Sequence, residues 1–456
     1  MSLTLSCFSF IGKFKQFVTI HSKLLLLALL ALACLILSTQ YFSSWHKGSW
    51  FINFQKDSEA LVIGKIIHDT YDRTEKITGN LYSVDFENTS IHSNAEIHIK
   101  EVYNYLKNSS ETKISSFNTY SSQFGLQGIF YSLLWNKLGL SLNILHLLTA
   151  FLTAFVLTII SYQFSRIISA SFGICFFVVC LLSPWLTSFA RNLYWVPFTW
   201  FLPAIISNLF LLIKESQKNK LIVYSCFTVA IIVKSLCGYE YLSTVILFAV
   251  GPFVFLFITT NNKNKLDYFK TAFIICLLSL LGFVIAVLIH TVQRSDNLVE
   301  GLIYLVKNDI ERRCYGSSDQ FDHPILKKSL DASVLDVLKI YILNWYSKVL
   351  YVVSIVETKF WKLCLISVTL IIAEYVFFSK KKSIVYFALS LSFLLPPLSW
   401  YVLAKSHSFI HVHMNYVLWY FGFVQVLYFI LIAFVEARIF EIVGKFKIHL
   451  LIFRSR

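Results

Sequence analysis

The stretch TAFIICLLSLLGFVIAVLIHT, residues 271–291, decides the fold, because it runs without a single Lys, Arg, Asp or Glu. A helix of about 20 mostly apolar residues is long enough to cross the hydrocarbon core of a bilayer. Further largely apolar runs lie near 24–42, 141–161, 168–188, 195–213, 221–237, 242–260, 358–379, 383–403 and 414–435. The sequence therefore predicts an all-α polytopic membrane protein with about ten transmembrane helices.

The composition excludes the soluble alternatives. Of the 456 residues, 57% are hydrophobic and 14% are charged, whereas roughly a quarter of the residues in a soluble domain are charged. A water-soluble core cannot bury so much apolar surface in a chain of this size. The same values exclude a disordered chain, a coiled coil and a disulfide-stapled secreted module.

The excess of basic residues predicts the orientation of the chain. The net charge is +15, and the cytoplasmic loops of membrane proteins retain Lys and Arg. If ten helices alternate, one side collects Lys13, Lys15, Lys23, Arg166, Lys214, Lys218, Lys220, Lys263, Lys265, Lys270, Lys380, Lys381, Lys382, Arg438, Lys445, Lys447, Arg454 and Arg456. The short turns on the other side hold only Arg191 and Lys405. We therefore expect cytoplasmic termini, an uncleaved first helix, membrane lipids as partners and no nucleic-acid binding.

The chain is predicted to form a single membrane-embedded domain, residues 1–456, with two enlarged outer loops at 43–123 and 292–344. Apolar residues recur at helical spacing between charged ones in the first loop, at Ala60, Ile63, Ile66 and Ile67. This pattern is typical of an amphipathic helix that lies on the membrane surface. A second such helix is expected over 126–138.

Two carboxylates open the first of these helices. Asp57 and Glu59 follow the first apolar run, in Gln55-Lys56-Asp57-Ser58-Glu59-Ala60. An ionisable group at the edge of a bilayer indicates a functional residue, here a general base toward an acceptor hydroxyl. The alternative is structural: Asp57 or Ser58 caps the helix, and Glu59 is a favourable charge in its first turn.

Asp57-Ser58-Glu59-Ala60, followed by a periodic apolar helix, resembles the GT-C class of glycosyltransferases. Protein O-mannosyltransferases and the lipid A aminoarabinose transferase belong to this class, whose motif is Asp-Glu followed by a small residue. The resemblance implies a polyprenyl-phosphate-linked sugar donor, a glycan or lipid-linked saccharide acceptor, and Asp57 as the base, because the first acid has that role in the class. Ser58 separates the two acids here, so Glu59 remains the alternative base. The layout agrees along the whole chain, while the motif itself covers only about ten residues.

Polar residues in three other outer turns extend this candidate site. Tyr120 and Gln123 end the first outer loop, where an aromatic ring and an amide suit contact with a sugar. Arg191 lies in the next outer turn, where its guanidinium suits either a lipid phosphate or the membrane interface. Glu240 follows Lys234, and the two form either a structural ion pair or a site in which the carboxylate faces a cavity.

The densest cationic outer turn is KSHSFIHVH, residues 405–413. Lys405, His407, His411 and His413 favour a cradle for the donor phosphate. A solvated loop is the next alternative, and a divalent-metal site is the last. The sequence has no CxxC and no Cys/His spacing typical of a resident metal, so we assign no metal ligands and no certain cofactor.

Arg312 and Arg313 in the second outer loop suit a lipid phosphate or an anionic acceptor, but the neighbouring Asp309 and Glu311 favour local ion pairs.

Two rival functions use a similar layout. An O-antigen polymerase depends on arginines in two late outer loops, and only Arg312 and Arg313 are available here. A lipid-linked-sugar flippase favours repeated halves and charges buried in the membrane. The resemblance favours a transferase of a bacterial inner membrane that modifies O-antigen or another lipopolysaccharide glycan on the periplasmic face.

Overall fold

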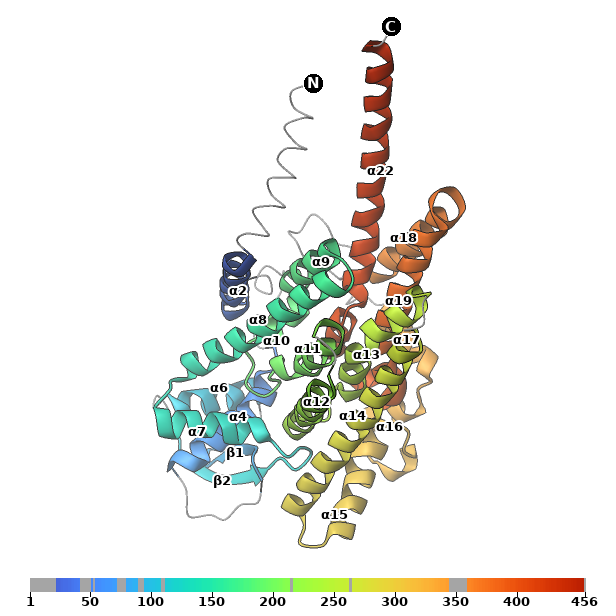
Figure 1. Cartoon of the computed structure of the whole chain (residues 1–456). Coiled ribbons are helices and arrows are strands. Elements are labelled where there is room, and N and C mark those ends of the chain that lie inside the picture. The colour runs from blue at the N-terminus through green and yellow to red at the C-terminus, as the bar shows by residue number, and fades with distance from the viewer. Residues whose placement is uncertain are drawn as a thin grey trace.

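The computed structural model describes residues 22–41, 51, 54–71, 79–88, 94–107, 111–213, 216–261, 265–343 and 359–454. Helices dominate it (Figure 1). Seven described helices are long and apolar enough to cross a membrane: α8 (Leu142–Ile167), α12 (Gln217–Cys237), α13 (Leu242–Thr259), α14 (Lys265–Arg294), α18 (Phe360–Ala373) with its continuation η4 (Glu374–Phe378), α19 (Lys380–Leu403) and α22 (Phe423–Arg454). Three shorter apolar helices are α2 (Ser22–Thr39), α9 (Ala170–Leu182) and α11 (Phe198–Leu212). The predicted class, a helical multi-pass membrane protein, is confirmed.

Each predicted apolar run contains one of these helices, but only seven have full span length, so the count of ten stays a prediction. The third run is interrupted, because Pro184 has no N–H to continue the helix. A new helix, α10 (Pro184–Phe189), begins there, and Ser183 Oγ accepts a hydrogen bond from Leu186 N (3.1 Å). The tenth run starts in the last two residues of the short helix α21 (Val412–Asn415) and continues through the 3₁₀-helix η5 (Tyr416–Tyr420). It then turns at Gly422, whose φ of +97° favours glycine.

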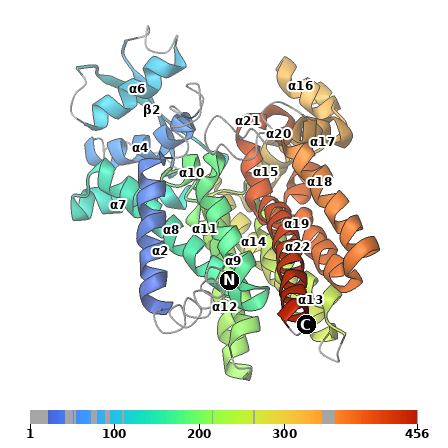
Figure 2. The same ribbon diagram turned by 90° about the horizontal axis from the view of Figure 1, so that it is seen from above.

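The two enlarged outer loops gather at one end of the helical bundle. Figure 2 shows this end at the top of the view, with α4 (Lys56–Tyr71), α6 (Ala95–Leu106), α16 (Pro324–Asp331), α17 (Val334–Leu343), α20 (Lys405–Ile410) and α21 (Val412–Asn415). The compartment that this end faces stays a prediction. Parts of the predicted topology lie outside the described residues: 42–50, 52–53, 72–78, 89–93, 108–110, 344, 358, Lys13, Lys15, Lys214, Lys263 and Arg456.

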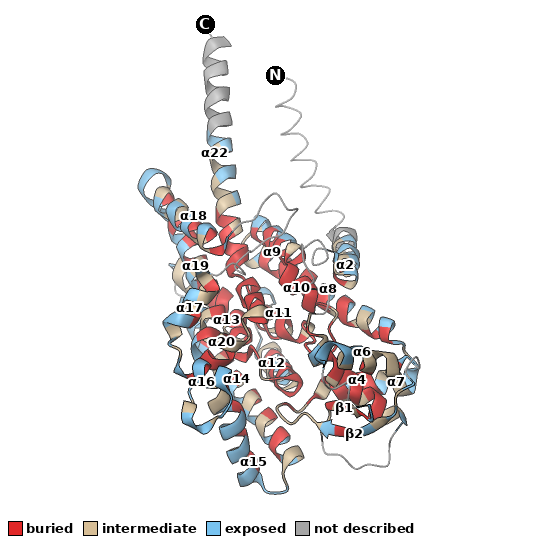
Figure 3. Ribbon diagram, turned by 180° about the vertical axis from the view of Figure 1, so that it is seen from behind, coloured by how far each residue is buried: buried red, intermediate tan, exposed pale blue. Residues whose placement is uncertain are grey.

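The first outer loop forms a small layered unit around α4. Its other elements are α6, α7 (Leu126–Leu138) and an antiparallel sheet of β1 (Tyr82–Phe86) and β2 (Ile114–Thr119). The bounds of α7 agree with the predicted helix at 126–138, whereas the sheet was not predicted. The prediction that α4 lies on the membrane surface is wrong. Its apolar residues Ile63, Ile66 and Ile67 are fully buried (Figure 3), because α6, α7 and β1 cover that face.

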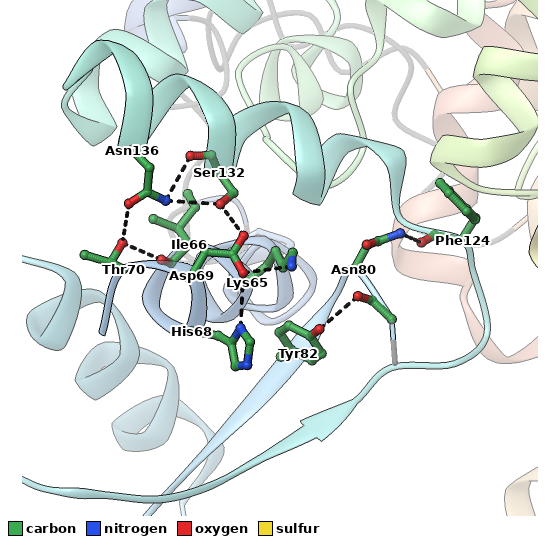
Figure 4. A network of polar contacts seen from close by, with 11 residues as sticks. Lys65, Ile66, His68, Asp69, Thr70, Asn80, Tyr82, Phe124, Ser132 and Asn136 are labelled. Carbon is green, nitrogen blue, oxygen red and sulfur yellow. Dashed lines mark hydrogen bonds and ion pairs between the residues drawn. The ribbon is translucent and has the colours of Figure 1, made fainter. Parts of the chain in front are cut away.

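A polar network fixes the end of α4 to α7 (Figure 4). The Asp69 carboxylate accepts hydrogen bonds from Lys65 Nζ (2.8 Å) and Ser132 Oγ (2.5 Å). Thr70 Oγ1 donates to Asn136 Oδ1 (3.1 Å). Burial raises the pKa of Asp69, but the hydrogen bonds from Lys65, Ser132 and His68 and the charge of Lys65 together outweigh burial and leave this pKa below its usual value. The side chain therefore stays a carboxylate and holds the two helices together.

At Gly64, helix α4 approaches β1 too closely to leave room for a side chain, and this position provides a test of the packing. A Cβ atom at this position would lie 2.1 Å from the carbonyl oxygen of Tyr82, a backbone atom that cannot move alone. We expect Gly64→Ala to lower the free energy of unfolding by about 1–3 kcal/mol, measured as a lower Tm in detergent. The control is Gly139→Asn, because a Cβ at Gly139 meets no atom within 4 Å and Asn tolerates left-handed backbone. An unchanged Tm for Gly64→Ala would contradict the close approach.

Candidate functional site

A cavity of about 570 Å³ lies at the loop end of the bundle. Its walls come from the start of α4, the end of β2, the turn before α11, the α12–α13 turn, the second outer loop and the α20–α21 segment. Six predicted site residues line it: Asp57, Tyr120, Glu240, His407, His411 and His413. The fold thus brings together side chains that are separated by as many as 356 positions in the sequence.

The start of α4 is fixed against the turn before α11. The indole Nε1 of Trp195 donates to Gln55 Oε1 (3.0 Å), and Asn192 Nδ2 donates to the carbonyl oxygen of Gln55 (3.0 Å). Because α4 begins at Lys56, Asp57 lies in its first turn and is not the residue that caps it. Asp57 is exposed and lines the cavity. Its carboxylate is therefore accessible to a ligand.

Glu59 has the opposite environment, although it is only two residues away. It is 5% exposed and does not line the cavity. Its carboxylate accepts hydrogen bonds from Leu193 N (2.9 Å) and the Tyr103 hydroxyl, and lies 3.0 Å from His146 Nε2. Burial raises the pKa of Glu59, but His146, Tyr103 and Leu193 N outweigh burial and lower it below its usual value. Glu59 is thus a charged structural residue that holds α4 to α6, to α8 and to the turn before α11.

The opposite wall carries a buried ion pair. Arg313 Nη2 lies 3.5 Å from Glu240 Oε1, and Gln123 Nε2 donates both to Glu240 Oε2 (2.7 Å) and to the Tyr194 hydroxyl (2.6 Å). Burial lowers the pKa of Arg313, but Glu240, Tyr120, Asp309 and Tyr194 together outweigh burial and raise it. Gln123 therefore does not line the cavity; it holds the carboxylate that does. Lys234 is not the partner of this carboxylate, because its Nζ donates to the backbone carbonyls of Gly238 (2.5 Å) and Glu240 (3.0 Å).

The prediction that Arg312 and Arg313 form ion pairs with the neighbouring acids is confirmed for Arg312 only. Arg312 lies 4.0 Å from Asp309, while Arg313 reaches Glu240, which is distant in the sequence. Both arginines line the cavity. They supply its positive charge in a form that suits planar, bidentate recognition of a phosphate.

The histidine turn is not a solvated loop. It forms the short helices α20 and α21, in which His407 is 7% exposed. The ring centroids of His407 and His411 are 4.4 Å apart, and those of His411 and His413 are 5.8 Å apart. Burial is the largest cause that lowers the pKa of all three imidazoles, and neighbouring imidazoles and arginines also lower the pKa of His407 and His411. The resulting pKa of His411 is about 4. At neutral pH these side chains are therefore neutral, and His407 Nδ1 is buried without a hydrogen-bond partner.

Two predicted phosphate ligands lie outside the cavity. Lys405 is buried and donates to the carbonyl oxygen of Leu330 (2.5 Å). Arg191 donates to the carbonyl oxygen of Ser38 (3.3 Å) and thus binds the end of α2. Both cations form structural bonds, because short polar turns between spans also have to satisfy helix ends.

The cavity also contains residues that the sequence reasoning did not select. Tyr194 and His323 both line it, although neither stands out in the sequence as a candidate site residue. Among the described residues, no group of three His, Cys, Asp or Glu side chains is arranged to hold a metal ion. The lining instead contains the exposed carboxylate of Asp57, the buried carboxylate of Glu240, two guanidinium groups, neutral imidazoles and aromatic rings.

No protein-family model, curated protein or solved structure matches the chain. The resemblance to GT-C glycosyltransferases, and the residue roles that it implies, therefore stay predictions. The function has to be argued from the chemistry of the cavity.

Replacing a carboxylate by an amide should change the stability of the protein at Glu59 but not at Asp57. We expect Glu59→Gln to lower the free energy of unfolding by about 1.5–3 kcal/mol, the range for hydrogen bonds to a charged group. The exposed Asp57→Asn serves as the matched control and should leave the Tm unchanged.

The same substitution has a pH signature. Because the pKa of Glu59 is lower in the folded protein, its stabilisation is present above the pKa of the unfolded chain and is lost as the pH falls through the folded pKa. Tm measured from neutral to acidic pH should fall further in the wild type than in Glu59→Gln. Parallel curves would show that Glu59 is not a buried, partnered carboxylate.

Proposed function

We propose that the chain is an inverting glycosyltransferase that moves a sugar from a polyprenyl-phosphate donor to a glycan or lipid-linked saccharide outside a bacterial inner membrane. The observation that carries the proposal is that Asp57, Arg312 and Arg313 line one cavity at the end of a bundle of apolar helices. Transfer from a phosphate-linked donor requires a base for the acceptor and charge stabilisation for the departing phosphate. The lining supplies both.

Asp57 has the role of base in this proposal. It takes the proton of the acceptor hydroxyl while that oxygen forms a bond to the anomeric carbon of the sugar. The bond from this carbon to the phosphate oxygen breaks, its electron pair leaves with the lipid phosphate, and the configuration inverts. Asp57 suits the role better than Glu59, because Asp57 is exposed in the cavity whereas Glu59 is buried among three structural partners.

Arg312 and Arg313 bind the phosphate in this proposal, in place of Arg191 and Lys405. Guanidinium groups remain charged at any physiological pH and bind phosphate through two parallel N–H bonds. His407 lines the same cavity, and its Nδ1 is buried without a hydrogen-bond partner. A neutral imidazole there supplies a hydrogen bond to the ligand and no charge of its own.

Aromatic side chains provide the surface for the sugar. Tyr120 and Tyr194 line the cavity with ring centroids 6.5 Å apart, and the Trp195 ring lies 5.3 Å from that of Tyr194. Such rings offer a flat apolar face and a polar edge, which fits the alternating C–H and O–H faces of a pyranose.

A lipid-linked glycan polymerase is the second candidate, and the position of Arg312 and Arg313 in the cavity is the observation that favours it. The two functions differ in their products. Loss of a polymerase leaves glycans of a single repeat unit, whereas loss of a transferase removes one sugar and leaves the chain length unchanged.

Asp57→Asn should reduce sugar transfer about 100-fold or more, because a general base contributes on the order of 10²–10⁴ to a rate. The measurement is the mass spectrum of the surface glycan in a host strain that lacks the gene and carries each variant at equal expression. Asp296→Asn is the matched control, since Asp296 is an exposed carboxylate in the second outer loop that does not line the cavity. A normal glycan with Asp57→Asn would exclude Asp57 as the base.

Arg313→Gln tests the phosphate role separately from the ion pair. Alone, it leaves the Glu240 carboxylate buried without its cation, which costs about 3–5 kcal/mol in comparable pairs. Adding Glu240→Gln removes the orphaned charge and should restore much of the Tm. Binding of polyprenyl phosphate, measured by native mass spectrometry, should stay at least about tenfold weaker in the double variant, because the guanidinium contacts are still missing. Wild-type affinity in the double variant would show that Arg313 is only a partner of Glu240.

A further inference from the structure

The helix that precedes the two cavity arginines has a surface that the proposed function does not use. It consists of α15 (Leu298–Leu305) and its π-helical continuation η2 (Val306–Glu311). Figure 1 shows α15 folded back beside the end of α14. Only a narrow strip of its surface is packed against the rest of the protein, and the buried residues of this strip are Gly301, Leu305 and Asp309. A Cβ atom at Gly301 would lie 2.6 Å from Thr291 Cγ2.

The contacts of this helix fix its depth relative to the spans. Arg294, the last residue of α14, bonds to Asp309 Oδ2 (3.1 Å), and its guanidinium lies 3.9 Å from the centroid of the Tyr304 ring. Arg313, just beyond η2, reaches Glu240 in the α12–α13 turn. These anchors belong to the ends of three apolar helices. The helix therefore lies at the level where the spans leave the membrane.

An apolar stripe runs along its uncovered side. Val299, Ile303, Val306 and Ile310 recur at spacings of four, three and four residues and are 62%, 49%, 42% and 43% exposed. Charged residues of both signs share the helix, at Glu300, Lys307 and Glu311. Figure 3 shows most of α15 as exposed. An amphipathic helix with an uncovered apolar stripe, at the end of a span, is typical of segments that lie in the membrane interface.

We propose that α15 and η2 form an interfacial helix whose stripe, Val299, Ile303, Val306 and Ile310, inserts into the acyl region of the outer phospholipid leaflet. Continuity with α14 argues for lipid as the occupant. On α14, the most hydrophobic span, Leu288 and Val292 are 40% and 68% exposed. Because α15 folds back and packs against α14, the stripe lies beside this exposed apolar end of the span (Figure 1).

The arrangement connects the bilayer to the cavity. Arg312 and Arg313 follow η2 directly, so insertion of the helix sets how deep these two guanidinium groups lie relative to the leaflet. Glu300 and Lys307 then face the headgroups and water. This inference rests on the surface of the helix and holds whichever reaction the cavity performs.

Photocrosslinking in nanodiscs tests the proposal. The photoreactive residue p-benzoylphenylalanine is placed at Ile303, and the full-length protein is reconstituted in nanodiscs of phosphatidylglycerol and phosphatidylcholine and irradiated. Mass spectrometry of the peptide should show a covalent phospholipid adduct. The matched control carries the photoreactive residue at Lys307, on the charged face of the same helix. The yield of lipid adduct should be roughly five-fold higher at Ile303, because an interfacial helix presents only its apolar face to the acyl chains.

Val299 provides a second position on the same stripe, so the test does not depend on one variant folding. Equal yields at the stripe and at Lys307, or no lipid adduct at Ile303 and Val299 in protein that keeps its Tm, would overturn the proposal. A crosslink from the stripe to a second protein chain would also overturn it and identify an interface between chains. Because the readout needs no sugar donor, its failure is distinguishable from a failure of the proposed transferase activity.

Discussion

The buried carboxylate of Glu59 is the interaction on which the candidate site depends. It ties α4 to α8 through His146, to α6 through Tyr103, and to the turn before α11 through Leu193 N. A carboxylate removed from water stays charged only with such partners, so the start of α4 has one position relative to that turn. The exposed carboxylate of Asp57, two residues earlier, is thereby held at the cavity. Glu59 thus has a structural role, whereas the carboxylate of Asp57 is accessible to a ligand.

In the rest of the cavity, too, the neighbouring side chains determine which ionisable groups remain charged. Arg313 stays charged beside Glu240, which Gln123 holds in turn, so one ion pair joins both outer loops and the α12–α13 turn. The imidazoles of His407 and His411 are buried beside these arginines and become neutral. The cationic character that the histidine turn suggests in the sequence is thus supplied by the second outer loop. A ligand would meet the guanidinium group of Arg312, the Arg313–Glu240 ion pair, the exposed carboxylate of Asp57 and a set of neutral imidazoles.

The sequence predicted the features that depend on local pattern. Hydropathy located every apolar helix, and periodicity gave the bounds of α7. The predictions from sequence were wrong where a segment that is distant in the sequence covers a helix or binds a side chain. The apolar face of α4 is covered by α6, α7 and β1, which periodicity cannot distinguish from cover by lipid. Lys405 and Arg191 bond to backbone carbonyls of other segments, and Arg313 pairs across 73 positions with Glu240. Six of the ten predicted site residues line the cavity. These residues could be selected from the sequence because polar residues that cluster in outer turns stand out from the apolar runs.

The central claim is that Asp57, Arg312 and Arg313 face one substrate in this cavity. The most direct measurement is a cryo-electron microscopy structure of the protein in nanodiscs with a polyprenyl-phosphate sugar. The account predicts the phosphate within hydrogen-bond distance of the Arg312 and Arg313 guanidinium groups, with the anomeric carbon on the side of Asp57. A phosphate bound instead at Arg191 or Lys405, or a cavity without lipid density while the donor binds elsewhere, would contradict it.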